Sequence, residues 1–120
     1  METAAQLDLE VPIGGTCEFY IQALNNDDLS TFDLTGSELV WTVVDGGGEQ
    51  IFSYSSATDA QVEITDAASG NFTLSLDDVI SALVPIGRVA RHKIERKIST
   101  ERAPLIVGYL RGDNGGNPNA

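Results

Sequence analysis

The strongest structural signal in this sequence is an alternation of apolar and other residues between positions 38 and 45. Leu39, Trp41 and Val43 fall on one side of an extended chain, because successive side chains of a strand point to opposite faces. Trp41 is the only tryptophan, and a lone tryptophan within a strand is typical of the largest residue of a sandwich core. The segment therefore predicts a strand that points Trp41 inward. The residues on its opposite face are Val40, Thr42 and Val44.

A turn is expected directly before this strand, at residues 31–36. Asp33, Thr35 and Gly36 are residue types that favour turns, because their side chains or the lack of one permit tight backbone geometry. Phe32 and Leu34 are apolar and would attach the turn to the core.

Other segments show the same alternation at a spacing of about ten residues, with turn-forming residues between them. The glycines at 46–48 and the turn at 66–70 predict two hairpins, and residues 100–103 would close a third. Helical spacing also allows residues 88–99 to form a helix, but a strand is favoured because 104–110 supplies its hairpin partner. A short helix is expected at 77–83, capped by Ser75 or Asp77. The expected strands are 7–11, 16–23, 37–45, 50–55, 61–65, 71–76, 88–99 and 104–110.

This pattern predicts an all-β, immunoglobulin-like sandwich of about seven to eight antiparallel strands with one short helix. A chain of 120 residues is long enough for one domain, which we expect at residues 7–111. Residues 1–6 are expected to form a flexible arm and the Gly- and Asn-rich residues 112–120 a flexible tail. No apolar run predicts a membrane span, and residues 1–15 lack the basic start of a signal peptide.

Charge is strongly segregated along the chain, whose net charge is −11. Residues 1–87 contain fifteen acidic residues and no Lys or Arg, whereas residues 88–120 contain seven basic residues and three acidic ones. The basic strand could pair with acidic neighbours in the same fold, or bind an acidic partner protein, including another copy. Nucleic acid is disfavoured, because the acidic body would repel phosphates and no aromatic residues lie among the basic ones. The candidate partner-binding residues are Arg88, Arg91, Lys93, Arg96, Lys97 and Arg102.

Residues that carry catalytic or metal chemistry are scarce. Cys17 alternates in phase with Phe19 and Ile21, so it is interpreted as a small buried apolar residue, and His92 as a solvated strand residue. One cysteine and one histidine make a nucleophile–base pair or a zinc site improbable on composition alone. We therefore expect no catalytic, cofactor-binding or metal-binding residues, and no enzymatic activity.

The order of several short motifs resembles a known family. These are Phe-Asp-Leu-Thr-Gly at 32–36, the turn and strand at 66–76, Leu-Val-Pro-Ile-Gly at 83–87, and Leu-Ile-Val-Gly-Tyr-Leu at 105–110. Together they are similar to the small immunoglobulin-like domains of tailed bacteriophage virions, such as the N-terminal domain of baseplate upper proteins. The resemblance covers residues 7–111, and the basic run at 88–97 departs from it.

The resemblance implies a structural role in the virion after synthesis in the host cytoplasm. The expected partners are other phage structural proteins, with a homo-oligomer such as a trimer, and with neither membrane nor nucleic acid. Attachment to tail, baseplate or fibre and decoration or cementing of the capsid both remain open. The alternative is a carbohydrate- or cell-surface-binding module, for which Tyr20 is the best-placed aromatic, ahead of Tyr54 and Tyr109.

Overall fold

The computed structural model describes residues 5–24 and 30–113, which form nine strands and one short helix. No helix in this part of the chain combines the length and the apolar character that crossing a membrane requires. The elements, in chain order, are β1 (Ala5–Gln6), β2 (Leu9–Pro12), β3 (Cys17–Gln22), β4 (Glu38–Val44), β5 (Gln50–Ser55), β6 (Val62–Asp66), β7 (Asn71–Leu76), α1 (Asp78–Ser81), β8 (Gly87–Ile98) and β9 (Glu101–Asp113).

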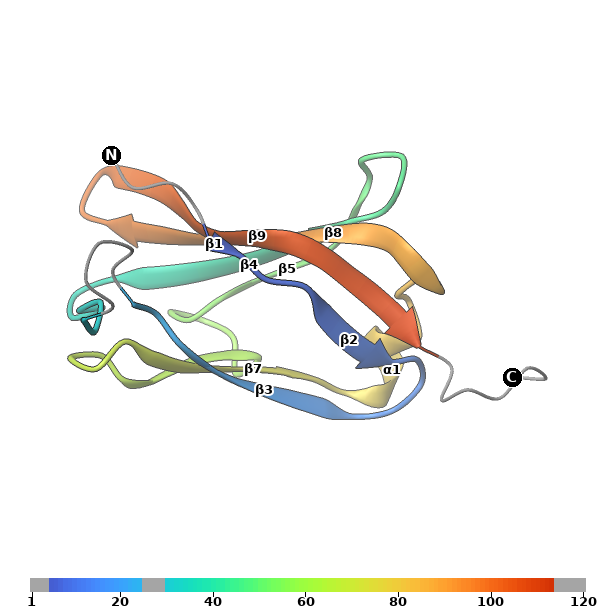
Figure 1. The fold of residues 1–120 in the computed structure, drawn as a ribbon, viewed down its shortest axis with the longest axis horizontal. Helices are drawn as coiled ribbons and strands as arrows, with labels where there is room; N and C mark the ends of the chain where they lie inside the picture. Colours follow the sequence, from blue (N-terminus) through green and yellow to red (C-terminus); the bar gives the residue numbers. More distant parts are fainter. Residues whose placement is uncertain (1–4, 25–29, 114–120) are drawn as a thin grey trace.

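The strands pack as two layers (Figure 1). The first sheet has the order β1-β9-β8-β4-β5, with β2 also paired to β9, and the second has the order β3-β7-β6. The helix α1 lies at one end of the sandwich, close to β2 in the view of Figure 1. The prediction of an all-β sandwich with one short helix is confirmed.

The core lies between the sheets, and the alternation in β4 determines which residues enter it. Leu39, Trp41 and Val43 are completely buried, as predicted. The ring of Trp41 meets Phe52 of the neighbouring strand edge-on, with centroids 5.0 Å apart and planes inclined at 74°. This arrangement is among the preferred geometries of aromatic pairs, which places the largest side chain at the centre of the core.

The turn before β4 is attached to the core as predicted. The Asp33 carboxylate accepts a hydrogen bond of 2.9 Å from the Thr35 backbone N–H, and Gly36 adopts a φ of 77°. Leu34 is fully buried, and its N–H donates to the Ala67 carbonyl at 2.7 Å. The turn therefore connects the start of β4 to the β6–β7 hairpin.

The β8–β9 hairpin is confirmed, but its turn is shorter than predicted. Ile98 pairs with Glu101, so only Ser99 and Thr100 form the turn, and Ser99 has a φ of 56°. The strand continues through Pro104, which lies beside a break in register between Ile94 and Glu95. A proline is tolerated at such an irregularity because no regular ladder hydrogen bond is lost.

The N-terminal segment runs parallel to β9, an arrangement that the sequence did not indicate. Leu7 donates its N–H to the Val107 carbonyl at 2.9 Å, and the Asp8 carboxylate accepts the Tyr109 N–H at 2.9 Å. Between β1 and β2 the Asp8 side chain thus replaces a backbone acceptor. Part of the expected arm, Ala5–Gln6, forms β1, and the first two residues of the expected tail, Gly112 and Asp113, belong to β9. Residues 1–4 and 114–120, like the loop expected at 25–28, lie outside the described residues.

Candidate protein-binding face

Four of the six predicted partner-binding residues lie on the outer face of the first sheet. Three of them lie on β8, out of phase with the buried Ala90, His92 and Ile94, and the fourth lies on β9. The register between β8 and β9 brings them into rows across the sheet, with Lys97 opposite Arg102. We call this surface the basic face; its four residues are Arg91, Lys93, Lys97 and Arg102.

The remaining two predicted residues lie elsewhere. Arg88 forms an ion pair of 3.0 Å with Asp8, and its guanidinium lies 5.2 Å from the ring centroid of Tyr109. Arg96 donates from Nε to the Ser37 hydroxyl at 2.8 Å, and it lies 5.0 Å from the ring centroid of Phe32. Arg96 therefore fastens the turn before β4 instead of joining the basic face.

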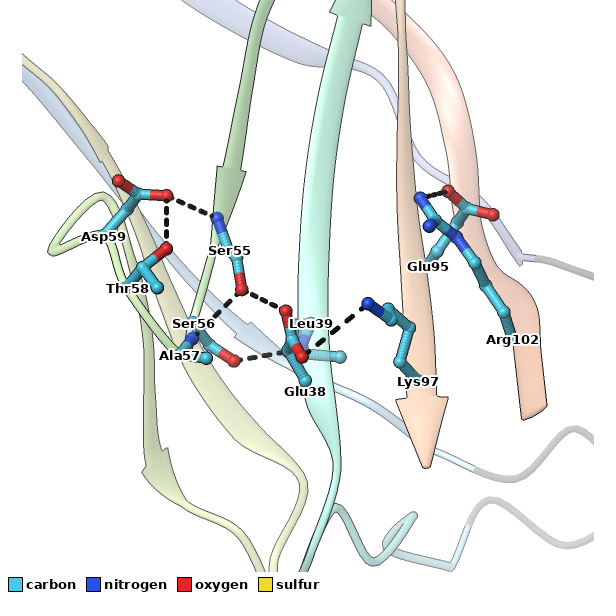
Figure 2. Close-up of polar contacts among 10 residues, drawn as sticks. All are labelled: Glu38, Leu39, Ser55, Ser56, Ala57, Thr58, Asp59, Glu95, Lys97 and Arg102. Carbon is cyan, nitrogen blue, oxygen red and sulfur yellow. Dashed lines mark hydrogen bonds and ion pairs between the residues drawn. The ribbon is translucent and has the colours of Figure 1, made fainter. Parts of the chain in front are cut away.

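One half of the basic face is neutralised by a half-buried acid. Arg102 contacts Glu95 at 2.6 Å and Lys93 contacts the same carboxylate at 3.6 Å, and the Glu95 side chain is only 12% exposed. The hydrogen bond from Arg102, with further help from the charge of Lys93, lowers the pKa of Glu95 against the effect of its burial. Figure 2 shows Arg102 turned toward Glu95 across the two strands.

The same half carries a second acid on β4. Lys97 lies 3.9 Å from Glu38, which also accepts a hydrogen bond from the Ser55 hydroxyl (Figure 2). Exposed ion pairs of this kind contribute about 0–1 kcal/mol each, because water screens them. This end of the basic face therefore satisfies its own charges, as one reading of the charge segregation expected.

The other end of the basic face combines apolar residues with Arg91 and with Lys93, which also reaches Glu95. A shallow depression of about 520 Å³ is lined by Val44, Val107 and Tyr109, with Arg91 and Lys93 beside them. Arg91 is exposed and forms no ion pair within residues 5–24 and 30–113. An apolar centre next to charged residues is the usual composition of a surface that binds another protein.

Sequence reasoning missed the apolar part of this surface. Val44 was assigned correctly to the side of β4 away from Trp41, but nothing in the sequence placed it on one depression with Val107 and Tyr109. Only the pairing of β4 with β8 and of β8 with β9 brings these residues together.

The interpretation of His92 as a solvated residue is wrong. His92 is 3% exposed, and its Nδ1 accepts a hydrogen bond of 3.2 Å from the Trp41 indole N–H. Its Nε2 lies 2.6 Å from the Leu7 carbonyl, so the neutral ring donates there. Burial lowers the pKa of His92. His92 is buried because it alternates along β8 in phase with Ala90 and Ile94, so the strand directs its side chain into the core.

Cys17 lies on the inward side of β3, as predicted, although it is only half-buried. Burial raises the pKa of its thiol, which lowers the fraction of reactive thiolate near neutral pH. Cys17 belongs to the second sheet and His92 to the first. Among the described residues no three His, Cys, Asp or Glu side chains gather closely enough to hold a metal ion.

These features define an immunoglobulin-like β-sandwich. Its characteristic features are two facing sheets, one that contains β4, β5, β8 and β9 and one built from β3, β6 and β7. A buried tryptophan on β4 is a further feature of this fold. The domain lacks the inter-sheet disulfide of antibody domains, since the sequence has one cysteine.

Among solved structures, the fold is similar to the N-terminal domain of phage TP901-1 ORF48. The two share 13% sequence identity with a TM-score of 0.56, and the match covers 93% of this chain and 90% of that one. A likeness at this identity is one of fold, and it agrees with the resemblance to a phage domain that the sequence motifs indicated. No family model and no curated protein matches the sequence.

Proposed function

We propose that this protein is a structural component of a tailed bacteriophage virion that binds other virion proteins through its basic face. The observation that carries the proposal is Arg91, an exposed cation without an ion pair among the described residues, next to the apolar Val44 and Tyr109. The sandwich fold, which is similar to a phage protein domain, supports a structural role instead of a catalytic one.

The chemistry of the face selects an acidic partner with an apolar centre. Val44, Val107 and Tyr109 supply area whose removal from water favours binding, while Arg91 and Lys93 attract carboxylates and orient the approach. Cations at the edge of an interface accelerate association more than they strengthen the final complex. Binding should therefore weaken with salt without disappearing.

The test is to incubate the protein with intact particles, emptied capsids and separated tails of the phage that encodes it, and to image where it binds. We expect the Arg91→Gln/Lys93→Gln variant to lose most of this binding. A matched control is Thr65→Glu/Ala68→Glu, which also lowers the net charge of −11 by two but changes exposed positions of β6 and its turn. This control should bind like the wild type.

The location of bound protein would separate tail attachment from capsid decoration. Binding to neither structure by the wild type would overturn the proposal. Equal loss of binding in both variants would also contradict it, because the effect would then reflect net charge and not the basic face.

A second candidate function has one observation in its favour. Tyr20 is 79% exposed on the outer face of the second sheet, beside a depression of about 330 Å³ that Gln22, Asn71 and Thr73 also line. An exposed aromatic ring with amide and hydroxyl neighbours suits the stacking and hydrogen bonding of a sugar. The carbohydrate-binding alternative predicts binding on a glycan array that the Tyr20→Ala variant loses; no binding by the wild type would exclude it for the glycans tested.

A further inference from the structure

The helix α1 buries a polar residue, whereas two large aliphatic residues of its turn are exposed. Hydrogen bonds from Leu83 N–H to the Ile80 carbonyl and from Val84 N–H to the Ser81 carbonyl extend its turn to residue 84. Ser81 and Val84 face the core and are 0% and 3% exposed. Val79 and Leu83, four residues apart and therefore on one side, are 68% and 56% exposed. A short helix at the surface usually presents polar residues on its outward side, so two exposed aliphatic side chains there are unusual.

Two side-chain hydrogen bonds hold the helix in this orientation. The Ser81 hydroxyl donates to the Gly15 carbonyl at 2.6 Å, and the Asp77 carboxylate accepts the Ile80 N–H at 2.9 Å. Rotating α1 to bury Val79 and Leu83 would leave Ser81 and the Gly15 carbonyl without these partners, at a cost in stability. The outward position of the two aliphatic side chains is therefore built into the fold.

The apolar exposure continues along the chain. Ile86 is 61% exposed and forms an isolated bridge to Gly112, which holds it at the end of the sandwich where β9 finishes. Seven large apolar side chains are exposed in the described part of the chain, and four of them lie in this segment: Val79, Leu83, Ile86 and Val89. Such concentration in one segment is typical of a contact surface. We call Val79, Leu83 and Ile86 the end patch.

The charges beside the end patch indicate what covers it. Asp77 and Asp78 are exposed at the start of α1, and the cation nearest to the patch along the chain, Arg88, forms an ion pair with Asp8. A partner that fits must present apolar area together with cations. The half of the basic face around Val44, Tyr109, Arg91 and Lys93 has this composition.

We propose that the end patch of one copy binds the basic face of a second copy. This inference rests on the proposed function, because it identifies one partner of the same face. In this contact each copy uses its end patch toward one neighbour and its basic face toward another, which makes the contact heterologous. Contacts of this type close into rings, such as a trimer, or extend into open chains.

The experiment uses two variants with complementary defects, studied by analytical ultracentrifugation. Val79→Ser/Leu83→Ser removes the apolar end patch, and Arg91→Glu/Lys93→Glu reverses the charge of the basic face. All four side chains are exposed, so both variants should fold, and an unchanged melting transition checks this. Each variant alone should self-associate at least about tenfold more weakly than the wild type, as expected when residues central to an interface are removed.

The decisive sample is the equimolar mixture. The patch variant retains a basic face and the face variant retains an end patch, so the mixture should form dimers and nothing larger. Self-association of the face variant alone at wild-type strength would overturn the proposal, because it would indicate patch-to-patch contact. A wild-type chain that stays monomeric at millimolar concentration would overturn it as well.

Failure of this inference can be distinguished from failure of the proposed function. If the patch variant and the wild type bind phage particles equally well but neither self-associates, only the inference fails. If the wild type self-associates as described but binds no particle, the proposed attachment to other virion proteins fails instead.

Discussion

At the scale of single residues, His92 links the core to the N-terminal segment. It accepts a hydrogen bond from Trp41 and donates one to the Leu7 carbonyl, so its neutral form is fully satisfied. A second proton would remove the acceptor for the Trp41 indole inside a buried site. The charged groups nearest this ring include Asp8, which favours protonation, but burial outweighs that effect and lowers the pKa of His92.

We therefore predict that stability falls as the pH drops below about 6.5, the ordinary value for histidine. The unfolded chain then binds a proton that the folded chain resists, so the free energy of unfolding decreases toward low pH. One proton changes it by at most about 1.4 kcal/mol per pH unit. Urea unfolding at pH 8, 7, 6 and 5 measures the slope.

The His92→Gln variant supplies the control. It should be less stable than the wild type at pH 8 because the buried bonds change, yet its stability should vary little between pH 7 and 5. The acids with lowered pKa values, Asp8, Asp33 and Glu95, affect stability only at lower pH. The same slope in both proteins would contradict the role assigned to His92.

Ser99 has a backbone conformation that lowers the stability of the fold. It has a φ of 56° at the tip of the β8–β9 hairpin, in the left-handed region that costs a residue with a side chain about 1 kcal/mol. Ser99→Gly should raise the free energy of unfolding by up to that amount, measured by chemical denaturation. Ser99→Ala should give no gain, and a gain equal to that of glycine would exclude relief of backbone strain.

At the scale of elements, the close approach of the N-terminal segment to β9 depends on Gly108. A Cβ atom at this position would lie 2.1 Å from the Leu7 carbonyl oxygen, which two heavy atoms cannot tolerate. Gly108→Ala should therefore displace residues 5–8 and expose the Leu7 N–H, at a cost of about 1–3 kcal/mol. Hydrogen exchange of the Leu7 amide measures the displacement.

Gly47 offers a matched control in the β4–β5 turn. A Cβ atom there would lie 3.4 Å from the Asp45 carboxylate, an ordinary contact. Gly47→Ala should leave stability within about 0.5 kcal/mol of the wild type. Unchanged protection of the Leu7 amide in Gly108→Ala would show that β9 shifts instead and that the segment is not held as described.

At the scale of the whole molecule, the charge segregation of the sequence becomes a difference between two faces. All seven basic residues belong to β8, β9 or the residues of that hairpin, and the second sheet contains acidic residues and no Lys or Arg. The acidic side of one copy repels the acidic side of another, while the basic face orients approach to a partner. Because the basic residues are all close together in the sequence, they lie on one side of the folded molecule.

This imbalance predicts that salt stabilises the protein. With a net charge of −11, the acidic side chains repel one another in the compact state. Raising NaCl from about 20 to 300 mM shortens the range of this repulsion to below 10 Å. The exposed ion pairs lose little, because each is weak. We expect the melting temperature to rise by a few degrees, and by more in the more acidic Arg91→Gln/Lys93→Gln variant. A fall with salt would show that the ion pairs dominate.

The sequence by itself determined the elements of this sandwich, because their signals are local. Period-two alternation located the central strands to within a few residues, and turn residues with one acidic cap located the hairpins and α1. It determined just as directly that the basic residues lie on one hairpin. These properties depend on neighbours within a few positions of each other.

Only the tertiary structure decided which segments meet. The parallel pairing of β1 and β2 with β9, the burial of His92 against Trp41, and the division of Arg96 from the other cations all require contacts between residues far apart in sequence. The inward side of α1 is fixed by the hydrogen bond from Ser81 to the Gly15 carbonyl and by the packing of Ile80 and Val84 on the core. Long-range pairing fixes register and orientation, and no local pattern encodes that choice.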